Sequence, residues 1–223
     1  MLEDRILFVD AEAIVIDKPA GLPVDRPRRG GDSVSDRLDE LKLGFHRPPV
    51  VMHRLDQDTS GCLLLGRNPK VVKKFAAAFE HGEVEKTYIA VVETALQEAE
   101  GVIHLPLAKV SSAESGWRMV VEPHGQPATT RWRRLAVRGD KSLVEFRPLT
   151  GRTHQLRVHA REGLGAPILG DPVYGKPRLH MMLHASRLVV PREKKDAIDV
   201  TAPLPPHFAE WAPLGTLGTE NEA

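Results

Sequence analysis

Short apolar runs separated by turn residues recur along the chain and predict strands. The runs "RILFVD" at 5–10 and "AIVIDKP" at 13–19 are rich in β-branched residues and are broken by "DAE", which predicts a hairpin. Another pair flanks Gly139-Asp140, a turn typical of antiparallel strands. The strands expected beyond the hairpin lie at 62–67, 86–93, 129–137, 142–148 and, after an irregular start, in the second half of 177–190.

Three segments instead show the spacing of a helix. The clearest is 68–82, where Asn68 can cap the first turn, Pro69 takes the first position and Gly82 ends the helix. We expect one side of this helix to be lined by Val72, Phe75 and Phe79. The other two helices are expected at 32–44, capped by Asp32 or Ser33 and ended by Gly44, and at 153–163.

These patterns predict an α+β fold. Strands outnumber helices, and most of the helices do not lie between parallel strands, so we expect a mostly antiparallel sheet. A chain of 223 residues is long enough to bury a real core, and it contains no repeat and no obvious linker. We therefore expect one domain over 1–214 and a disordered polar tail over 215–223.

Composition changes this picture in two respects. There is no apolar signal segment or membrane-spanning run, and Cys62 is the only cysteine, so we predict a cytoplasmic protein without a membrane partner. The net charge is only +1, yet nine Lys and Arg stand against two acids between Arg131 and Arg161. That segment is either a phosphate-binding face or a solvated pair of charged strands, and the charge count alone leaves both open.

The stretch "HRLDQDTSG", residues 53–61, places charges between two apolar runs. Asp56 follows Leu55 just before a buried strand, and a carboxylate there stays ionised only beside a cation or several donors. Arginines are available at Arg54 and, far along the chain, in "GRTHQLRVH" at 151–159. An isolated stretch of this kind also fits an Asx-type turn that leads into a strand.

"GRTHQLRVH" has two arginines and two histidines at helical spacing, with His154 and Arg157 on one face. It is either a solvated basic helix or a segment with one arginine pointing inward and others reaching phosphates. His180 and His184 in "HMMLH" have the spacing of a metal pair, but no third ligand is obvious and we predict no metal. The sequence has neither a P-loop nor a dinucleotide fingerprint, so no nucleotide cofactor is expected.

Together these motifs resemble the RluA-type pseudouridine synthases, which isomerise uridine in RNA. The resemblance runs from about residue 5 to 211 and combines "VIDKPAGLPV", "HRLDQDTSG", "KTYIAVV", "GRTHQLRVH", "ILGDPVYG", "LHASRL" and "TAPLP" in the family's order. It implies the pseudouridine synthase fold, a bent and mainly antiparallel mixed sheet with flanking helices and a central catalytic cleft. We expect a stand-alone catalytic domain without the small N-terminal RNA-binding domain that many relatives have.

The resemblance also implies roles for individual residues. Asp56 is expected to be the nucleophile, Arg157 to pair with it, and Tyr88 to lie against the target base and move the proton from carbon 5. Arg54 is expected to fill the space left by a flipped-out uridine. The other expected substrate-binding residues are Leu183, Arg152 and His154.

The expected partner is RNA, either ribosomal RNA or a tRNA stem-loop. Candidate phosphate contacts are the basic strands from Arg131 to Arg147 and the loop with Arg26, Arg28 and Arg29, with surface solvation as the competing explanation. The reaction needs no cofactor, because uracil supplies both bonding atoms, and we expect a monomer. Whether Asp56 attacks the anomeric carbon or acts through a glycal-type elimination stays open.

Two other functions compete with this one. A catalytically silent RNA-binding module would use the same cleft but would not need a carboxylate there. An N-glycosidic hydrolase would use Asp56 and Asp58 as its pair of acids and would release free base.

Overall fold

The computed structural model describes residues 1–27, 30–112 and 116–211. Its strands are β1 (Ile6–Val9), β2 (Ala13–Lys18), β3 (Val50–Val51), β4 (Ser60–Gly66), β5 (Glu85–Val92), β6 (Glu100–His104), β7 (Leu107–Ser112), β8 (Gly116–Val121), β9 (Thr129–Arg138), β10 (Lys141–Pro148), β11 (Leu183–Val190) and β12 (Ile198–Thr201). Its helices are α1 (Pro69–Glu80), α2 (Gln155–Val158), which runs into a π-helical turn (His159–Gly163), and short 3₁₀ helices at Glu3–Arg5, Ser35–Leu41 and Pro206–Phe208. The expected tail at 215–223 lies outside the described residues.

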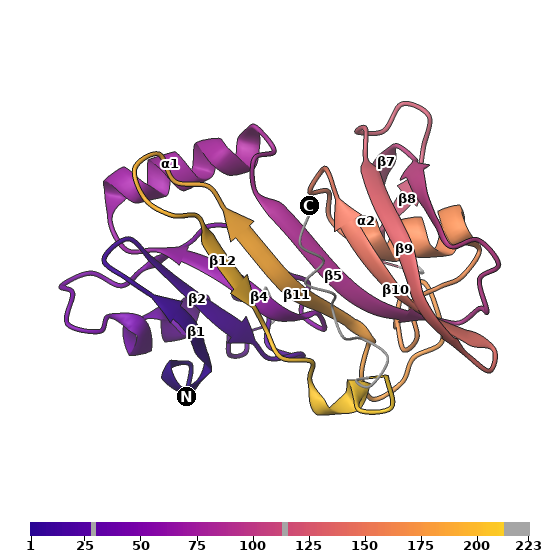
Figure 1. The fold of residues 1–223 in the computed structure, drawn as a ribbon, viewed down its shortest axis with the longest axis horizontal. Helices are drawn as coiled ribbons and strands as arrows, with labels where there is room; N and C mark the ends of the chain where they lie inside the picture. Colours follow the sequence, from indigo (N-terminus) through magenta and orange to yellow (C-terminus); the bar gives the residue numbers. More distant parts are fainter. Residues whose placement is uncertain (28–29, 113–115, 212–223) are drawn as a thin grey trace, which may run out of the picture.

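Ten strands form one sheet in the order β1-β2-β4-β11-β5-β10-β9-β6, with β3 added to β4 and β12 added to β11. Every pairing is antiparallel except the contact of β4 with β11, which is parallel and short. Beyond that contact β12 pairs with the rest of β11, and Figure 1 shows β11 between β12 and β5. The predicted α+β class with a mainly antiparallel mixed sheet is confirmed.

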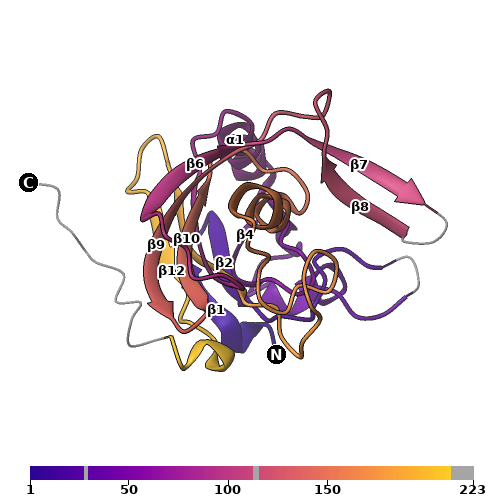
Figure 2. The same ribbon diagram turned by 90° about the vertical axis from the view of Figure 1, so that its right-hand side faces the viewer.

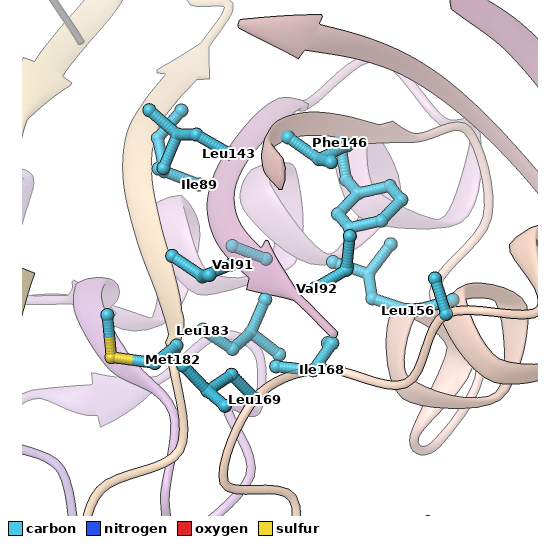
Figure 3. Close-up of a cluster of buried hydrophobic side chains, with 14 of the residues drawn as sticks. Ile89, Val91, Val92, Leu143, Phe146, Leu156, Ile168, Leu169, Met182 and Leu183 are labelled. Carbon is cyan, nitrogen blue, oxygen red and sulfur yellow. The ribbon is translucent and has the colours of Figure 1, made fainter. Parts of the chain in front are cut away.

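The largest buried cluster lies where β5 and β10 meet the segment that follows α2. Figure 3 shows Val92 and Phe146 from the two strands beside Leu156 of α2 and Ile168 of the following segment. All four side chains are less than 10% exposed, and burying such side chains contributes about 1.5–3 kcal/mol each. This core fixes the position of α2 relative to β5, and these two elements carry Arg157 and Tyr88.

Helix α1 begins as predicted, and its buried face agrees in part with the expected stripe. The side chain of Asn68 accepts a hydrogen bond from Val71 N at 3.0 Å, and Pro69 occupies the first turn. The buried residues are Val71, Phe75 and Ala78. Of the expected stripe, Phe75 is buried and Phe79 is partly buried against the same cluster, whereas Val72 is only partly buried and its neighbour Val71 takes the core position. Both stripes have helical spacing, and the sequence pattern does not separate them.

The remaining helix and strand predictions are partly correct. The helix expected at 32–44 is a short 3₁₀ helix at Ser35–Leu41, and Ser33, one of the two expected caps, accepts a hydrogen bond from Asp36 N in the first turn at 3.2 Å. The hairpin of β1 and β2, the strands β4, β5, β9 and β10, and the irregular start before β11 follow the prediction. The strands that the pattern missed are β3, β6, β7, β8 and β12.

Strands β7 and β8 form a separate two-stranded sheet. Figure 2 shows this hairpin extending away from the main sheet, with α2 between the two. Buried Leu107 and Met119 anchor the hairpin against Val158 and Tyr174, and Tyr174 Oη accepts a hydrogen bond from Met119 N at 2.9 Å. The hairpin is therefore fixed at its base to the elements that carry Arg157.

Candidate active site

The loop before β4 is held in place by Lys18, a residue for which the sequence predicted no role. The Lys18 side chain is fully buried, and its ammonium donates to the carbonyls of Pro19 at 2.8 Å, Leu22 at 2.7 Å and Gln57 at 3.0 Å. Burial lowers the pKa of Lys18 to about 8, although the charges of Asp58 and Asp56 oppose this. Lys18 thus ties the loop after β2 to the loop that carries Asp56. The available signal was a charged residue that ends a β-branched run.

The end of the "HRLDQDTSG" stretch brings β4 against β11. Gly61 has φ of +108°, and a Cβ atom there would lie 2.2 Å from the carbonyl oxygen of Ala185, so the close approach requires glycine. The preceding Ser60 Oγ is 2.8 Å from His184 Nδ1. Burial lowers the pKa of His184 to about 4, so this histidine is neutral and bonded to Ser60. His184 therefore has a structural role, because its bond to Ser60 joins β11 to β4.

The first residue of the same stretch is also structural. His53 Nε2 accepts a hydrogen bond from Leu64 N at 3.0 Å, and the ring stacks on Phe79 at 5.0 Å between centroids. Burial lowers the pKa of His53 to about 3, so the ring stays neutral and keeps this acceptor. His53 thereby fixes the start of the loop to β4.

Asp56 and Arg157 form the predicted pair. Arg157 Nη1 donates to Asp56 Oδ2 at 3.0 Å although the two residues are 101 positions apart. The Arg157 side chain is 4% exposed, whereas that of Asp56 is 25% exposed and so only partly buried. The carboxylate lies at the surface of a cleft, with a buried cation behind it.

A second carboxylate holds the other side of the guanidinium. Arg157 Nε and Nη2 donate to Asp171 Oδ2 at 2.7 Å and to Oδ1 at 2.8 Å, a bidentate pair in which Asp171 is fully buried. The same carboxylate accepts from the backbone N–H groups of Val173 and Tyr174 at 2.8 and 3.0 Å. Asp171 lies in the motif "ILGDPVYG", and the sequence alone assigned it no role.

The charges of this cluster offset its burial. Burial by itself lowers the pKa of Arg157, but the hydrogen bonds and charge of Asp171, and then those of Asp56, raise it above its usual value. Burial likewise raises the pKa of Asp171, yet Arg157 and the two backbone donors leave it lowered. Both groups are therefore ionised at neutral pH, with Arg157 between two carboxylates.

A cleft of about 580 Å³ opens in front of this pair. Its walls include all seven residues predicted for catalysis and substrate binding, namely Arg54, Asp56, Tyr88, Arg152, His154, Arg157 and Leu183. Tyr88 comes from β5 and Leu183 from the start of β11, so the cleft lies where the two meet. Burial, and then the charge of Asp56, raise the pKa of Tyr88, and its phenol remains protonated.

His154 is strained and close to the carboxylate. Its φ of +52° lies in the left-handed region, which non-glycine residues rarely adopt. Its Nδ1 is 2.9 Å from the Tyr174 hydroxyl, and its Nε2 is 3.9 Å from Asp56 Oδ2. Burial lowers the pKa of His154 despite the charge of Asp56, so the ring is neutral at pH 7. Arg152, at the start of this turn, is exposed at the rim of the cleft.

Arg54 is an exposed side chain at the mouth of the cleft. It is 77% exposed, and its nearest carboxylate partner is Asp25 at 3.4 Å, itself 59% exposed. Such a pair contributes little to stability and is easily replaced by a ligand. Of the two acids in the loop, only Asp56 lines the cleft, which disfavours a hydrolase that uses Asp56 and Asp58.

Three arginines of the predicted phosphate-binding strands, Arg131, Arg133 and Arg147, are turned away from this cleft. In β9 and β10, Trp132 pairs with Phe146 and Arg131 pairs with Arg147; Phe146 in turn pairs with Tyr88. Because successive side chains of a strand point to opposite faces, the two arginines lie on the face opposite Tyr88. Arg133 shares that face and pairs with Glu145 at 3.7 Å. In the other predicted group Arg26 pairs with Asp36 at 2.8 Å, while Arg28 and Arg29 lie outside the described residues.

Known proteins resemble the chain over most of its length. The family model described as RNA pseudouridylate synthase matches residues 12–162. An uncharacterized RNA pseudouridine synthase from Zymomonas mobilis is 52% identical over 94% of this chain and 98% of its own. The ribosomal large subunit pseudouridine synthase C from Rickettsia bellii is 32% identical over 92% of this chain and 70% of its own.

In the described part of the chain, no helix has both the length and the apolar character needed to cross a membrane.

Solved structures agree with the family match. The human RNA pseudouridylate synthase domain containing 4 has a TM-score of 0.80 at 27% identity, over 96% of this chain and 93% of that one. The chain belongs to the RNA pseudouridylate synthase family, whose members convert uridine to pseudouridine in RNA, and it is an enzyme of that class.

Proposed function

We propose that Asp56 is the nucleophile of the isomerisation and that Arg157 keeps it ionised and oriented. The observation that carries this proposal is the 3.0 Å pair between the partly exposed Asp56 and the buried Arg157 at the wall of the cleft. A carboxylate held in this way can reach the ribose of a uridine in the cleft, while Asp171 prevents Arg157 from moving with it.

The reaction breaks the bond between ribose C1′ and uracil N1, joins C1′ to uracil C5, removes the proton from C5 and leaves N1 protonated, so that no atom is gained or lost overall. One carboxylate can start it by two routes, attack on C1′ or removal of the C2′ proton to give a glycal. Deuterium at C2′ slows turnover severalfold only if that proton leaves in the rate-limiting step. A severalfold isotope effect on the single-turnover rate would therefore identify the glycal route.

Tyr88 is proposed to assist the last step. Because its pKa is raised, the phenol is protonated when substrate arrives, so it can relay the C5 proton through its hydroxyl but does not begin as a phenolate. Arg54 is proposed to occupy the space of the flipped uridine, since it is exposed at the mouth of the cleft. Leu183, Arg152 and His154 are proposed to contact the base and its neighbouring phosphates.

The proposed substrate is structured RNA. The Rickettsia relative is named for the large ribosomal subunit, which supports ribosomal RNA, and a tRNA stem-loop is the alternative. Carbodiimide sequencing of RNA from cells with and without this gene identifies the modified positions. We also propose that the protein is a monomer, uses no nucleotide cofactor and is located in the cytoplasm. Light scattering of the purified protein tests whether it is a monomer.

The Asp56→Asn variant tests the assignment of the nucleophile. We expect it to fold, to bind RNA and to form no pseudouridine, because the amide keeps the shape of the side chain but loses its charge. Tritium release from RNA that carries carbon-5-labelled uridine measures turnover. Asp58→Asn, two residues away and outside the cleft, is the matched control and should retain activity within about tenfold, or ~1.4 kcal/mol of barrier.

The outcome also separates the competing functions. If Asp56→Asn turns over within that same tenfold range, Asp56 is not the nucleophile. If wild-type protein binds RNA tightly without releasing tritium or free uracil, the chain is a silent binding module. Release of free uracil would instead identify a hydrolase.

A further inference from the structure

The β7–β8 hairpin presents a tryptophan that the catalytic roles above do not use. Trp117 is 46% exposed, whereas Trp132 and Trp211 are 8% and 4% exposed. Trp117 and Met119 alternate along β8 and therefore share one face, and Met119 is buried against Tyr174. Trp117 thus lies on the side of the hairpin that faces the site.

A second pocket of about 520 Å³ lies under this tryptophan. Its walls are formed by Arg54, Lys109, Trp117, Met119 and Thr153. Two of these residues, Arg54 and Thr153, also line the cleft that contains Asp56. The pocket therefore adjoins the cleft, and its volume is in the range of small-ligand sites.

The composition of the pocket matches one chemical class of ligand. Trp117 offers an aromatic face, Met119 an apolar wall and Thr153 a hydroxyl, while Lys109 and Arg54 provide cations. None of the five lining residues is acidic. Aromatic faces stack on nucleobases, and lysine and arginine bind the phosphates that link them. The exposed Lys109 ammonium lies 4.8 Å from the Trp117 ring centroid, and its flexible chain can swing towards a phosphate.

We propose that this pocket binds one unpaired base of the RNA, next to the target uridine, by stacking on Trp117. In this arrangement Lys109 and Arg54 contact the phosphate that joins the two nucleotides. The proposal rests on the proposed function, because it takes the cleft as the site of the target uridine. It makes Trp117 a determinant of which uridine the enzyme accepts.

The pocket is also connected to the catalytic carboxylate. The Trp117 ring lies 4.9 Å from the His154 ring, and His154 Nε2 is 3.9 Å from Asp56. A base stacked on Trp117 therefore restrains His154 beside the nucleophile. Occupancy of the pocket should raise the rate of the chemical step as well as the affinity.

Binding of short RNAs tests the proposal without requiring turnover. The first probe is an RNA of nine uridines. In two further probes, the nucleotide directly before or directly after the central uridine is abasic. Affinity is measured by fluorescence anisotropy, and the quenching of tryptophan emission is measured on the same samples. The proteins are wild type, Trp117→Ala, Trp117→Phe and the control Val110→Ala, which changes an exposed side chain on the other face of the hairpin.

We expect Trp117→Ala to weaken binding about tenfold or more, the usual loss of one stacked base, and Trp117→Phe to lose less. Val110→Ala should bind like wild type. One abasic RNA should weaken wild-type binding by a similar factor and should have no further effect on Trp117→Ala, because both changes remove the same contact. RNA at saturation should quench the part of the wild-type emission that Trp117→Phe lacks.

The proposal would be overturned if Trp117→Ala bound RNA as tightly as wild type. It would also be overturned if the losses of affinity caused by Trp117→Ala and by the abasic nucleotide were additive, or if saturating RNA did not quench the tryptophan emission. These outcomes differ from those expected if the proposed function were wrong. If it were wrong, wild-type protein would form no pseudouridine in total cellular RNA, whatever its binding to the short RNAs.

Discussion

Arg157 is the residue on which the electrostatics of the site depend. It neutralises two carboxylates, and the fully buried one is Asp171 rather than Asp56. We predict that Arg157→Met lowers the free energy of unfolding by about 3–5 kcal/mol at pH 7, chiefly because Asp171 is left buried without a cation. Chemical denaturation measures this loss. The control Arg187→Met breaks a half-exposed pair with Asp199 and should cost about 0–1 kcal/mol.

The same variant should reverse the response to acid. In wild type the pKa of Asp171 is lowered, so its contribution to stability is lost as the pH falls through the pKa of the folded protein. Without Arg157, burial raises that pKa above the value of about 3.9 in the unfolded chain, and the folded state then gains stability as the pH falls. The gap between wild type and Arg157→Met should therefore narrow between pH 7 and pH 5. A constant gap would show that Asp171 is stabilised by another group.

Lys18 should make stability depend on pH in the alkaline range. Its pKa is about 8 in the folded protein against 10.5 for an ordinary lysine, so between these values the unfolded chain binds more protons and wild type gains stability as the pH rises. Lys18→Met leaves three carbonyls without their donor and should lower the free energy of unfolding by roughly 3 kcal/mol at pH 7. The loss should grow by up to about 1.4 kcal/mol per pH unit from pH 8 to 9.5. Lys74→Met, on an exposed pair with Glu193, should show neither effect.

At the scale of elements, the contact of β4 with β11 depends on one glycine. We predict that Gly61→Ala costs several kcal/mol more than Gly139→Ala in thermal or chemical unfolding. Both glycines have positive φ, and alanine in that conformation costs about 1–2 kcal/mol, but only the Gly61 Cβ would meet backbone. Similar losses for the two variants would mean that β4 and β11 can separate without cost.

The sequence predicted elements and site residues unequally, for physical reasons. Strands β4, β5 and β10 are apolar on both faces and could be recognised, whereas β7 and β8 carry polar and exposed positions and were missed. The range of α1 was predicted from its pattern and its capping residues. The pair Asp56–Arg157 was predicted from the family resemblance. Lys18 and Asp171 were not assigned roles, because their partners Gln57 and Arg157 lie 39 and 14 residues away and meet them only in the folded chain.

At the scale of the whole molecule, the basic residues divide between the two faces of the sheet. We predict that Arg152→Gln, at the rim of the cleft, weakens RNA binding and reduces the slope of log affinity against log salt by about 1. Arg131→Gln, on the face opposite Tyr88, should leave both unchanged. Filter binding at several salt concentrations measures the two slopes. Equal effects of the two substitutions would mean that the RNA also covers the outer face of the sheet.

The central position of β11 has a consequence for how the enzyme is made. A ribosome completes β4, β5, β10 and α2 before it reaches Leu183, so the carboxylate and the arginine are both synthesised while the strand that separates β4 from β5 is still missing. The two halves of the sheet cannot take their final spacing until that strand inserts between them. A nascent or truncated chain that ends before residue 183 should therefore lack the cleft. Such a chain should not modify uridines in the RNA around the ribosome before its synthesis is complete.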